Sequence, residues 1–161
     1  MGMPPRFRDA LEVLIRHEVD FIVVGGVAGV LLGAPIATFD IDVVHERSSG
    51  NLDRLWGALT ELEACYRDPT GRHLPPSRDA FAGSGHNLML TKFGPVDFLG
   101  TIGHGHAYEE LLPESFPVAL ENFEMRVLNL EALIRIKEET AGDKDRAALV
   151  ILRRTLVEQK R

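Results

Sequence analysis

The chain has 161 residues, of which 45% are hydrophobic and 26% are charged. This composition excludes a disordered chain, and the length predicts a single domain over residues 1–161. The only cysteine, Cys65, excludes a disulfide framework and any CxxC metal motif. No apolar run reaches the roughly 18 residues of a membrane-spanning helix, and the start lacks the apolar core of a secretory signal. We therefore expect a cytoplasmic protein without a membrane partner.

The net charge of −6 is unevenly distributed along the chain. It is −9 up to residue 124 and +3 from residue 125 onward. An acidic body disfavours binding along a nucleic-acid duplex, whereas the basic end offers a local surface for phosphates. For most of these basic residues, a solvated helix face is the favoured explanation.

The first half of the chain alternates helical and strand patterns. Apolar spacing and β-branched runs predict, in chain order, an amphipathic helix over 6–18, a strand over 21–24, a short helix over 27–33, a strand over 39–45 and an amphipathic helix over 51–64. Between the first strand and the short helix stands Gly25-Gly26, and Pro35 stops that helix.

The second half predicts strands followed by two helices. In order, we expect a loop over 66–85, a hairpin of strands 86–92 and 96–100, a glycine- and histidine-rich loop over 101–106, strands over 116–121 and 123–128, and helices over 129–140 and 143–159. This order predicts an α/β or α+β fold with a mixed sheet flanked by helices. Its core spans about 19–100, and residues 129–160 form a short carboxyl-terminal helical pair.

The most informative segment carries two aspartates on one predicted strand. Asp40 and Asp42 are two residues apart, so their side chains share a face, with Cα atoms roughly 6.5–7 Å apart. Two carboxylates on one face repel each other unless a cation lies between them, and Mg²⁺ prefers such oxygen ligands. A third acid, Asp97, lies on another predicted strand. Three acids on adjacent strands can hold two ions for in-line phosphoryl chemistry.

A glycine turn stands upstream of these acids. Gly25 and Gly26 lie where a strand passes into a helix, and glycines there let the backbone approach a phosphate closely. Tight packing of the turn explains the glycines alone equally well. A dinucleotide-binding turn is the first rival, but it needs G-x-G-x-x-G and one later acid, whereas this chain has glycines at 25, 26, 29 and 33 and paired acids.

Taken together, these motifs resemble the DNA polymerase beta-like nucleotidyltransferase superfamily. The likeness lies in the GG turn, the short helix ending in glycine, Thr38 two residues before the DxD, and a third acid on a later strand. The layout is similar to the minimal nucleotidyltransferases that include the toxin of type IV abortive-infection systems, and the helical ending over 128–149 is also similar. The resemblance spans about 19–149.

The resemblance implies a function and a set of site residues. The reaction would move a nucleoside monophosphate from an NTP to an acceptor hydroxyl of an RNA end such as tRNA, a protein or a small molecule, with release of pyrophosphate. Two Mg²⁺ ions would be held by Asp40, Asp42 and Asp97, which are also the catalytic acids. Nucleotide binding would fall to Gly25, Gly26, Thr38, Lys137, Lys144 and Asp145. A cognate antitoxin or a second copy of the chain are the partners that this group implies.

Two features leave alternatives open. Many relatives have an arginine shortly before the Thr-x-Asp-x-Asp run, where this chain has Ile36 and Ala37, and its loss removes a possible phosphate contact. Many also have serine where this chain has Gly26, but glycine occurs there in the same group. A non-catalytic module that binds a nucleotide or a protein partner on the same fold is therefore the alternative function. His104 and His106, in a GHGH loop, are a secondary suggestion for contact with substrate.

Overall fold

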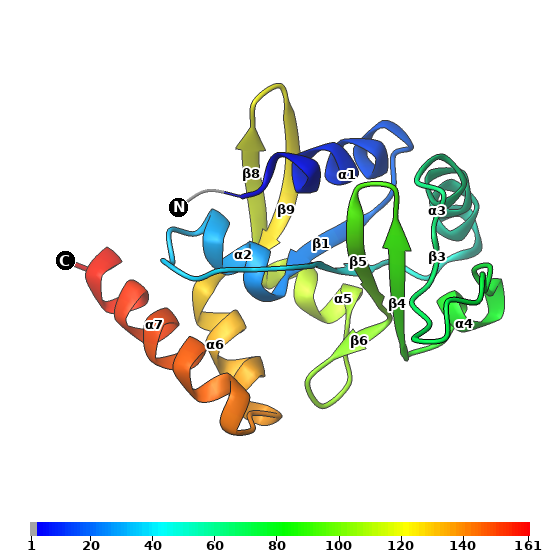
Figure 1. Ribbon diagram of the computed structural model, residues 1–161. Coiled ribbons are helices and arrows are strands. Elements are labelled where there is room, and N and C mark those ends of the chain that lie inside the picture. The colour runs from blue at the N-terminus through cyan, green and yellow to red at the C-terminus, as the bar shows by residue number, and fades with distance from the viewer. Residues whose placement is uncertain (1–2) are drawn as a thin grey trace.

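The computed structural model describes residues 3–161, and in α7 the side chain of Lys144 lies outside the described part. A seven-stranded mixed sheet forms its centre, with helices around it (Figure 1). The strands of this sheet are β1 (Phe21–Val24), β2 (Ile41–His45), β3 (Cys65–Tyr66), β4 (His86–Thr91), β5 (Gly94–Leu99), β8 (Ser115–Leu120) and β9 (Phe123–Leu128). Two further short strands, β6 (Thr101–Ile102) and β7 (His106–Ala107), pair with each other.

The sheet has the strand order β3-β4-β5-β2-β1-β9-β8. β2 runs parallel to β5 and β1 runs parallel to β9, whereas the other neighbours are antiparallel. The two central strands are largely buried: β1 is apolar and buried throughout, and β2, which carries Asp42 and His45, is buried except at Asp42. Continuous burial of this kind fits strands that are covered on both faces.

The helices pack around this sheet and against each other (Figure 1). They are α1 (Pro5–Arg16), α2 (Gly25–Leu31), α3 (Ser49–Glu61), α4 (Arg78–Ala82), α5 (Tyr108–Leu111), the 3₁₀ turn η1 (Leu112–Glu114), α6 (Leu130–Glu139) and α7 (Asp143–Gln159). The last two form the expected pair at the carboxyl end. The pair is attached to the body where Gln159 Nε2 donates to the carbonyl of Leu32 at 2.6 Å.

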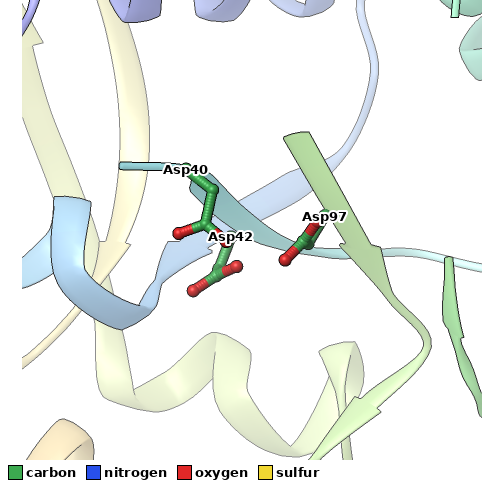
Figure 2. A group of neighbouring side chains, drawn as sticks. All are labelled: Asp40, Asp42 and Asp97. Atoms are coloured by element: carbon green, nitrogen blue, oxygen red, sulfur yellow. The ribbon is translucent and has the colours of Figure 1, made fainter. Parts of the chain in front are cut away.

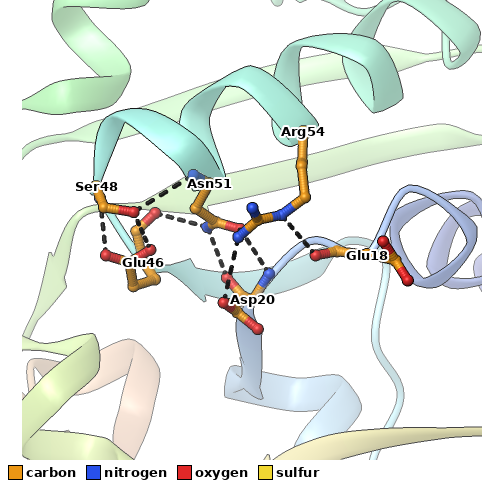
Figure 3. Close-up of polar contacts among 6 residues, drawn as sticks. All are labelled: Glu18, Asp20, Glu46, Ser48, Asn51 and Arg54. Atoms are coloured by element: carbon orange, nitrogen blue, oxygen red, sulfur yellow. Dashed lines mark hydrogen bonds and ion pairs between the residues drawn. The ribbon is translucent and has the colours of Figure 1, made fainter.

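A buried asparagine fixes the start of α3 to the ends of β1 and β2 (Figure 3). Asn51 Nδ2 donates to the carbonyls of Asp20 (3.0 Å) and Glu46 (2.7 Å), and its Oδ1 accepts from Asp20 N (2.8 Å). Ser48 caps the helix by accepting from Asn51 N at 3.3 Å. Arg54 Nε donates to the carbonyl of Glu18 at 2.9 Å. These bonds fix β1 and β2 at the ends opposite those that carry the glycine turn and Asp42.

Most predicted elements are confirmed, with several differences. The short helix expected over 27–33 is α2, which begins at Gly25, so the two glycines form its first turn. Residues 108–114, for which the sequence predicts no element, form α5 and η1. Strand β2 begins at Ile41, so Asp40 stands just outside the sheet. The segment 66–85, predicted as a loop, contains the second residue of the edge strand β3 and all of α4. The loop over 101–106 contains β6 and the first residue of β7. Within the described residues, no helix is both long and apolar enough to cross a membrane.

Candidate functional site

Three carboxylates converge at the centre of the sheet (Figure 2). Asp42 on β2 lies directly opposite Asp97 on the parallel strand β5, and Asp40 precedes β2 by one residue. Opposed positions in neighbouring strands point to the same face. One oxygen of each of the three side chains lies within 4.8 Å of the other two. The structure therefore brings together all three acids that the sequence singles out.

Burial and mutual repulsion both act on this group. The pKa of Asp42 is raised to about 8, first by burial and then by the neighbouring charges of Asp40 and Asp97. The pKa of Asp97 is also raised, mainly by burial, while the positive charge of Arg67 opposes that shift. A site that disfavours its own negative charges to this degree is suited to a cation.

Arg67 is a site residue that the sequence reasoning missed. It follows β3 directly, and its Nη2 lies 2.7 Å from Asp97 Oδ1, an ion pair that is not aligned as a hydrogen bond. Its Nη1 donates to the carbonyl of Met89 at 3.2 Å, which fixes the guanidinium over β4. No local pattern points to this contact, because Arg67 lies in the segment 66–85, which the sequence predicts as a loop.

The glycine turn lies against the acids. Gly25 has φ +65°, and a Cβ there would stand 2.2 Å from Asp42 Oδ2. A Cβ on Gly26 would stand 2.8 Å from Thr38 Oγ1. Only glycine therefore allows the turn to pass so close to Asp42 in this left-handed conformation. Thr38 Oγ1 in turn donates to the carbonyl of Asp40 at 3.0 Å.

A cavity of about 420 Å³ opens beside the acids. It runs from the glycine turn and Asp40 and Asp42 to the carboxyl-terminal helices, which contribute Lys137 and apolar side chains such as Leu133 and Leu152. Lys137 lowers the pKa of Asp42, against the larger raising effects, and its Nζ pairs with Asp145 Oδ1 at 3.0 Å. The structure thus places Gly25, Gly26, Thr38 and Lys137 on one cavity. Lys144 lies in the first turn of α7, where its side chain is outside the described residues.

The histidine loop is attached to α6. His106 bridges Glu110 (2.7 Å from Nδ1) and Glu139 (2.9 Å from Nε2), and both carboxylates raise the pKa of His106. His104 N donates to Glu139 Oε1 at 2.9 Å. Gly103, which directly precedes His104, lines the cavity together with Ile102. The loop therefore forms part of the cavity wall, held there by an ionic contact.

The donor set matches a hard divalent cation. Mg²⁺ takes carboxylate oxygens, completes its shell with water and substrate phosphates, and commonly uses only a few protein ligands. Asp40, Asp42 and Asp97 supply such oxygens within 4.8 Å of one another. Burial and the neighbouring charges of Asp40 and Asp97 raise the pKa of Asp42, and a cation between the carboxylates would oppose that repulsion. These residues fit the ion.

Solved structures of nucleotidyltransferases share the fold of this chain. A proposed nucleotidyltransferase from Thermotoga maritima superposes over 99% of this chain and 96% of its own, with TM-score 0.59 and 16% identity. The lincomycin-bound lincosamide antibiotic adenylyltransferase LnuA matches with TM-score 0.63 and 9% identity, over 94% of this chain and 97% of its own.

The antibiotic-resistance factor ANT(2'')-Ia, in its solution structure, matches with TM-score 0.58 and 12% identity, over 94% of this chain and 82% of its own. No protein-family model and no curated protein matches the sequence. At these identities the likeness defines the fold: the chain has the nucleotidyltransferase fold, with a mixed sheet and a carboxyl-terminal helical pair.

Proposed function

We propose that this protein is a Mg²⁺-dependent nucleotidyltransferase that moves a nucleoside monophosphate from an NTP to an acceptor hydroxyl and releases pyrophosphate. The observation that carries the proposal is the convergence of Asp40, Asp42 and Asp97 beside a glycine turn that opens into a cavity. The fold shared with nucleotidyltransferases supports it. Because one of them is named an adenylyltransferase, ATP is the first nucleotide to test.

The nucleotide occupies the cavity in this proposal. The backbone of Gly25 and Gly26 faces the triphosphate, since both residues line the cavity and the absence of a Cβ lets their backbone lie close to Asp42 and Thr38. Lys137 leaves its ion pair with Asp145 and binds a phosphate of the nucleotide. Thr38 keeps the backbone at Asp40 in place through its hydrogen bond to the Asp40 carbonyl. Lys144 is proposed on the family resemblance alone.

The three aspartates have two roles in this proposal, metal binding and proton acceptance. Asp40, Asp42 and Asp97 would hold two Mg²⁺ ions, which when bound supply charge neutralisation and alignment of the reacting phosphate. Asp97, at the side away from the glycine turn, accepts the proton of the acceptor hydroxyl. Arg67 favours the ionised form of Asp97 that this step needs, because its positive charge opposes the raised pKa.

Label transfer tests the proposal. NTPs labelled at the α-phosphate are incubated with Mg²⁺, the protein and a lysate that is afterwards separated into RNA, protein and small molecules. We expect label in one fraction with the wild type, none with Asp42→Asn, and an unchanged result with Asp53→Asn, an exposed carboxylate paired with Arg78. Tight binding of Mg-NTP without label in any fraction would instead establish the non-catalytic module.

The toxin-like role, a cognate antitoxin and self-association remain predictions from the sequence. Arrest of growth on expression of the wild type, but not of Asp42→Asn, is the expected sign of a toxin. Growth that is unaffected by the wild type would contradict that role and leave the enzymatic proposal standing.

A further inference from the structure

An apolar strip lies on the sheet directly beside the acids. β4 alternates between exposed and buried side chains, and its exposed face carries Leu88 and Leu90, which are 44% and 45% exposed. The opposite face carries Asn87 and Met89, which are buried in the core. Exposed faces of antiparallel strands are normally polar, so adjacent exposed leucines in this position call for a physical reason.

The strip is in register with the candidate site. Leu88 is the cross-strand partner of Asp97, which is itself the partner of Asp42. Arg67 N donates to the carbonyl of Leu88 at 3.0 Å, so the same row continues to Arg67 at the edge of the sheet. Residues in such a row share one face. The order across the sheet is therefore glycine turn, Asp42, Asp97, Leu88 and Arg67.

This order fixes the direction from which an acceptor arrives, given the proposed function on which the inference rests. In-line displacement places the attacking oxygen opposite the leaving pyrophosphate. With the triphosphate at the glycine turn, the acceptor hydroxyl lies at Asp97, and the body of the acceptor lies over β4. We propose that Leu88 and Leu90 form the acceptor-binding surface and that the acceptor is a small hydroxylated compound with an apolar body.

The charges around the strip disfavour an RNA acceptor. The three arginines of the adjoining segment each face a carboxylate: Arg67 faces Asp97, Arg72 faces Asp68 and Arg78 faces Asp53. Two positive charges lie at the tip of the hairpin: Lys92, with its Nζ 5.4 Å from the Phe93 ring centroid, and Arg6, whose Nη2 donates to the carbonyl of Lys92 at 2.9 Å. Binding of a phosphate backbone relies on several lysines and arginines free to neutralise phosphates, and a chain of net charge −6 adds no general attraction.

Two matched probes test the surface without relying on turnover. Methyl-labelled protein with Mg²⁺ and a non-hydrolysable ATP analogue is titrated with methyl glucoside or with octyl glucoside below its micellar concentration, and leucine methyl resonances are followed by NMR. Both probes carry the same hydroxyls, but only one has an apolar body. Octyl glucoside should shift the Leu88 and Leu90 methyls and bind at least about tenfold more tightly, since burial of two methylenes suffices for that factor.

Variants test whether octyl glucoside binds specifically at Leu88 and Leu90 or at any exposed apolar side chain. Leu88→Gln and Leu90→Gln should each weaken binding of octyl glucoside at least about fivefold, with folding checked by thermal melting. Phe116→Gln, on the far edge strand β8 and also exposed, should leave it unchanged.

Equal affinity of the two probes, loss of binding in Phe116→Gln alone, or leucine shifts produced only by an RNA ending in CCA would overturn the proposal. Leucine shifts that depend on protein concentration without any probe would show a second copy of the chain on the strip, which would also overturn it. If no nucleotidyl transfer is detected while octyl glucoside still binds at Leu88 and Leu90, the proposed function is wrong but the assignment of this ligand-binding surface is retained.

Discussion

Replacement of Asp42 by asparagine should stabilise the metal-free protein. The pKa of Asp42 is raised from 3.8 to about 8 in the folded chain, and one pKa unit corresponds to about 1.4 kcal/mol. At pH 7, Asp42 therefore lowers the free energy of unfolding by up to about 4 kcal/mol relative to a neutral side chain of the same shape. Since solvent and relaxation reduce this figure, we expect a gain of about 2–4 kcal/mol, or a Tm increase of about 5–15 °C.

The stabilisation expected for Asp42→Asn should depend on pH. Because the folded pKa lies above the unfolded value, the protonated carboxyl stabilises the fold fully below about pH 3.8, and that contribution is lost as the pH rises toward 8. In chelator, the advantage of Asp42→Asn should therefore grow from pH 5 to pH 8. Excess Mg²⁺ with NTP should reverse the order, since only the wild type gains stability from the bound ligand.

Urea denaturation in chelator at several pH values measures the effect. Asp53→Asn, at an exposed ion pair, is the control and should remain within about 0.5 kcal/mol of the wild type. A variant Asp42→Asn that is less stable than the wild type at pH 8, or an advantage that does not change with pH, would refute the reasoning about the acidic group.

Three further predictions concern the turn, the α3 attachment and the buried histidine. Gly25→Ala should lower stability by about 1–3 kcal/mol and weaken Mg²⁺ binding in calorimetry, because its Cβ would collide with the carboxylate of Asp42. The control Gly85→Ala, with open space around the Cβ, should change neither quantity. Equal effects of the two substitutions would contradict this prediction. Asn51→Ala should lower the unfolding free energy by about 2–4 kcal/mol in urea and leave Mg²⁺ affinity unchanged, since it removes three bonds to the backbone away from the acids. Burial lowers the pKa of His45, whose Nε2 donates to a carbonyl, so the stability that neutral His45 contributes is lost as the pH falls below about 6.5. His45→Phe should therefore reduce the change in unfolding free energy between pH 7.5 and 5.5. An unchanged slope of unfolding free energy against pH would argue against this role.

Local patterns in the sequence account for most of the fold. The apolar run over 21–24 ends at a glycine pair and matches β1 residue for residue, and α7 begins and ends as predicted at residues 143 and 159. Around the turn over 93–95, strands β4 and β5 form the predicted hairpin. These elements could be predicted because the periodicity and the residues that end each element lie within the element itself.

The remaining features depend on contacts between distant segments. β3 has only two residues, and its strand conformation comes from pairing with β4. Arg67 reaches Asp97 over a separation of 30 residues, which no local pattern encodes. The three acids themselves could be chosen from the sequence, but the register that sets Asp42 opposite Asp97 is a property of the assembled sheet.

A crystal grown with Mn²⁺ and a non-hydrolysable NTP tests the central claim most directly. Mn²⁺ replaces Mg²⁺ in oxygen-ligand sites and is located by its anomalous scattering. The account predicts an anomalous peak at roughly 2.0–2.3 Å from carboxylate oxygens of Asp40, Asp42 and Asp97, with the triphosphate against Gly25 and Gly26. Nucleotide bound elsewhere, or a map without an anomalous peak at the three carboxylates, would contradict it.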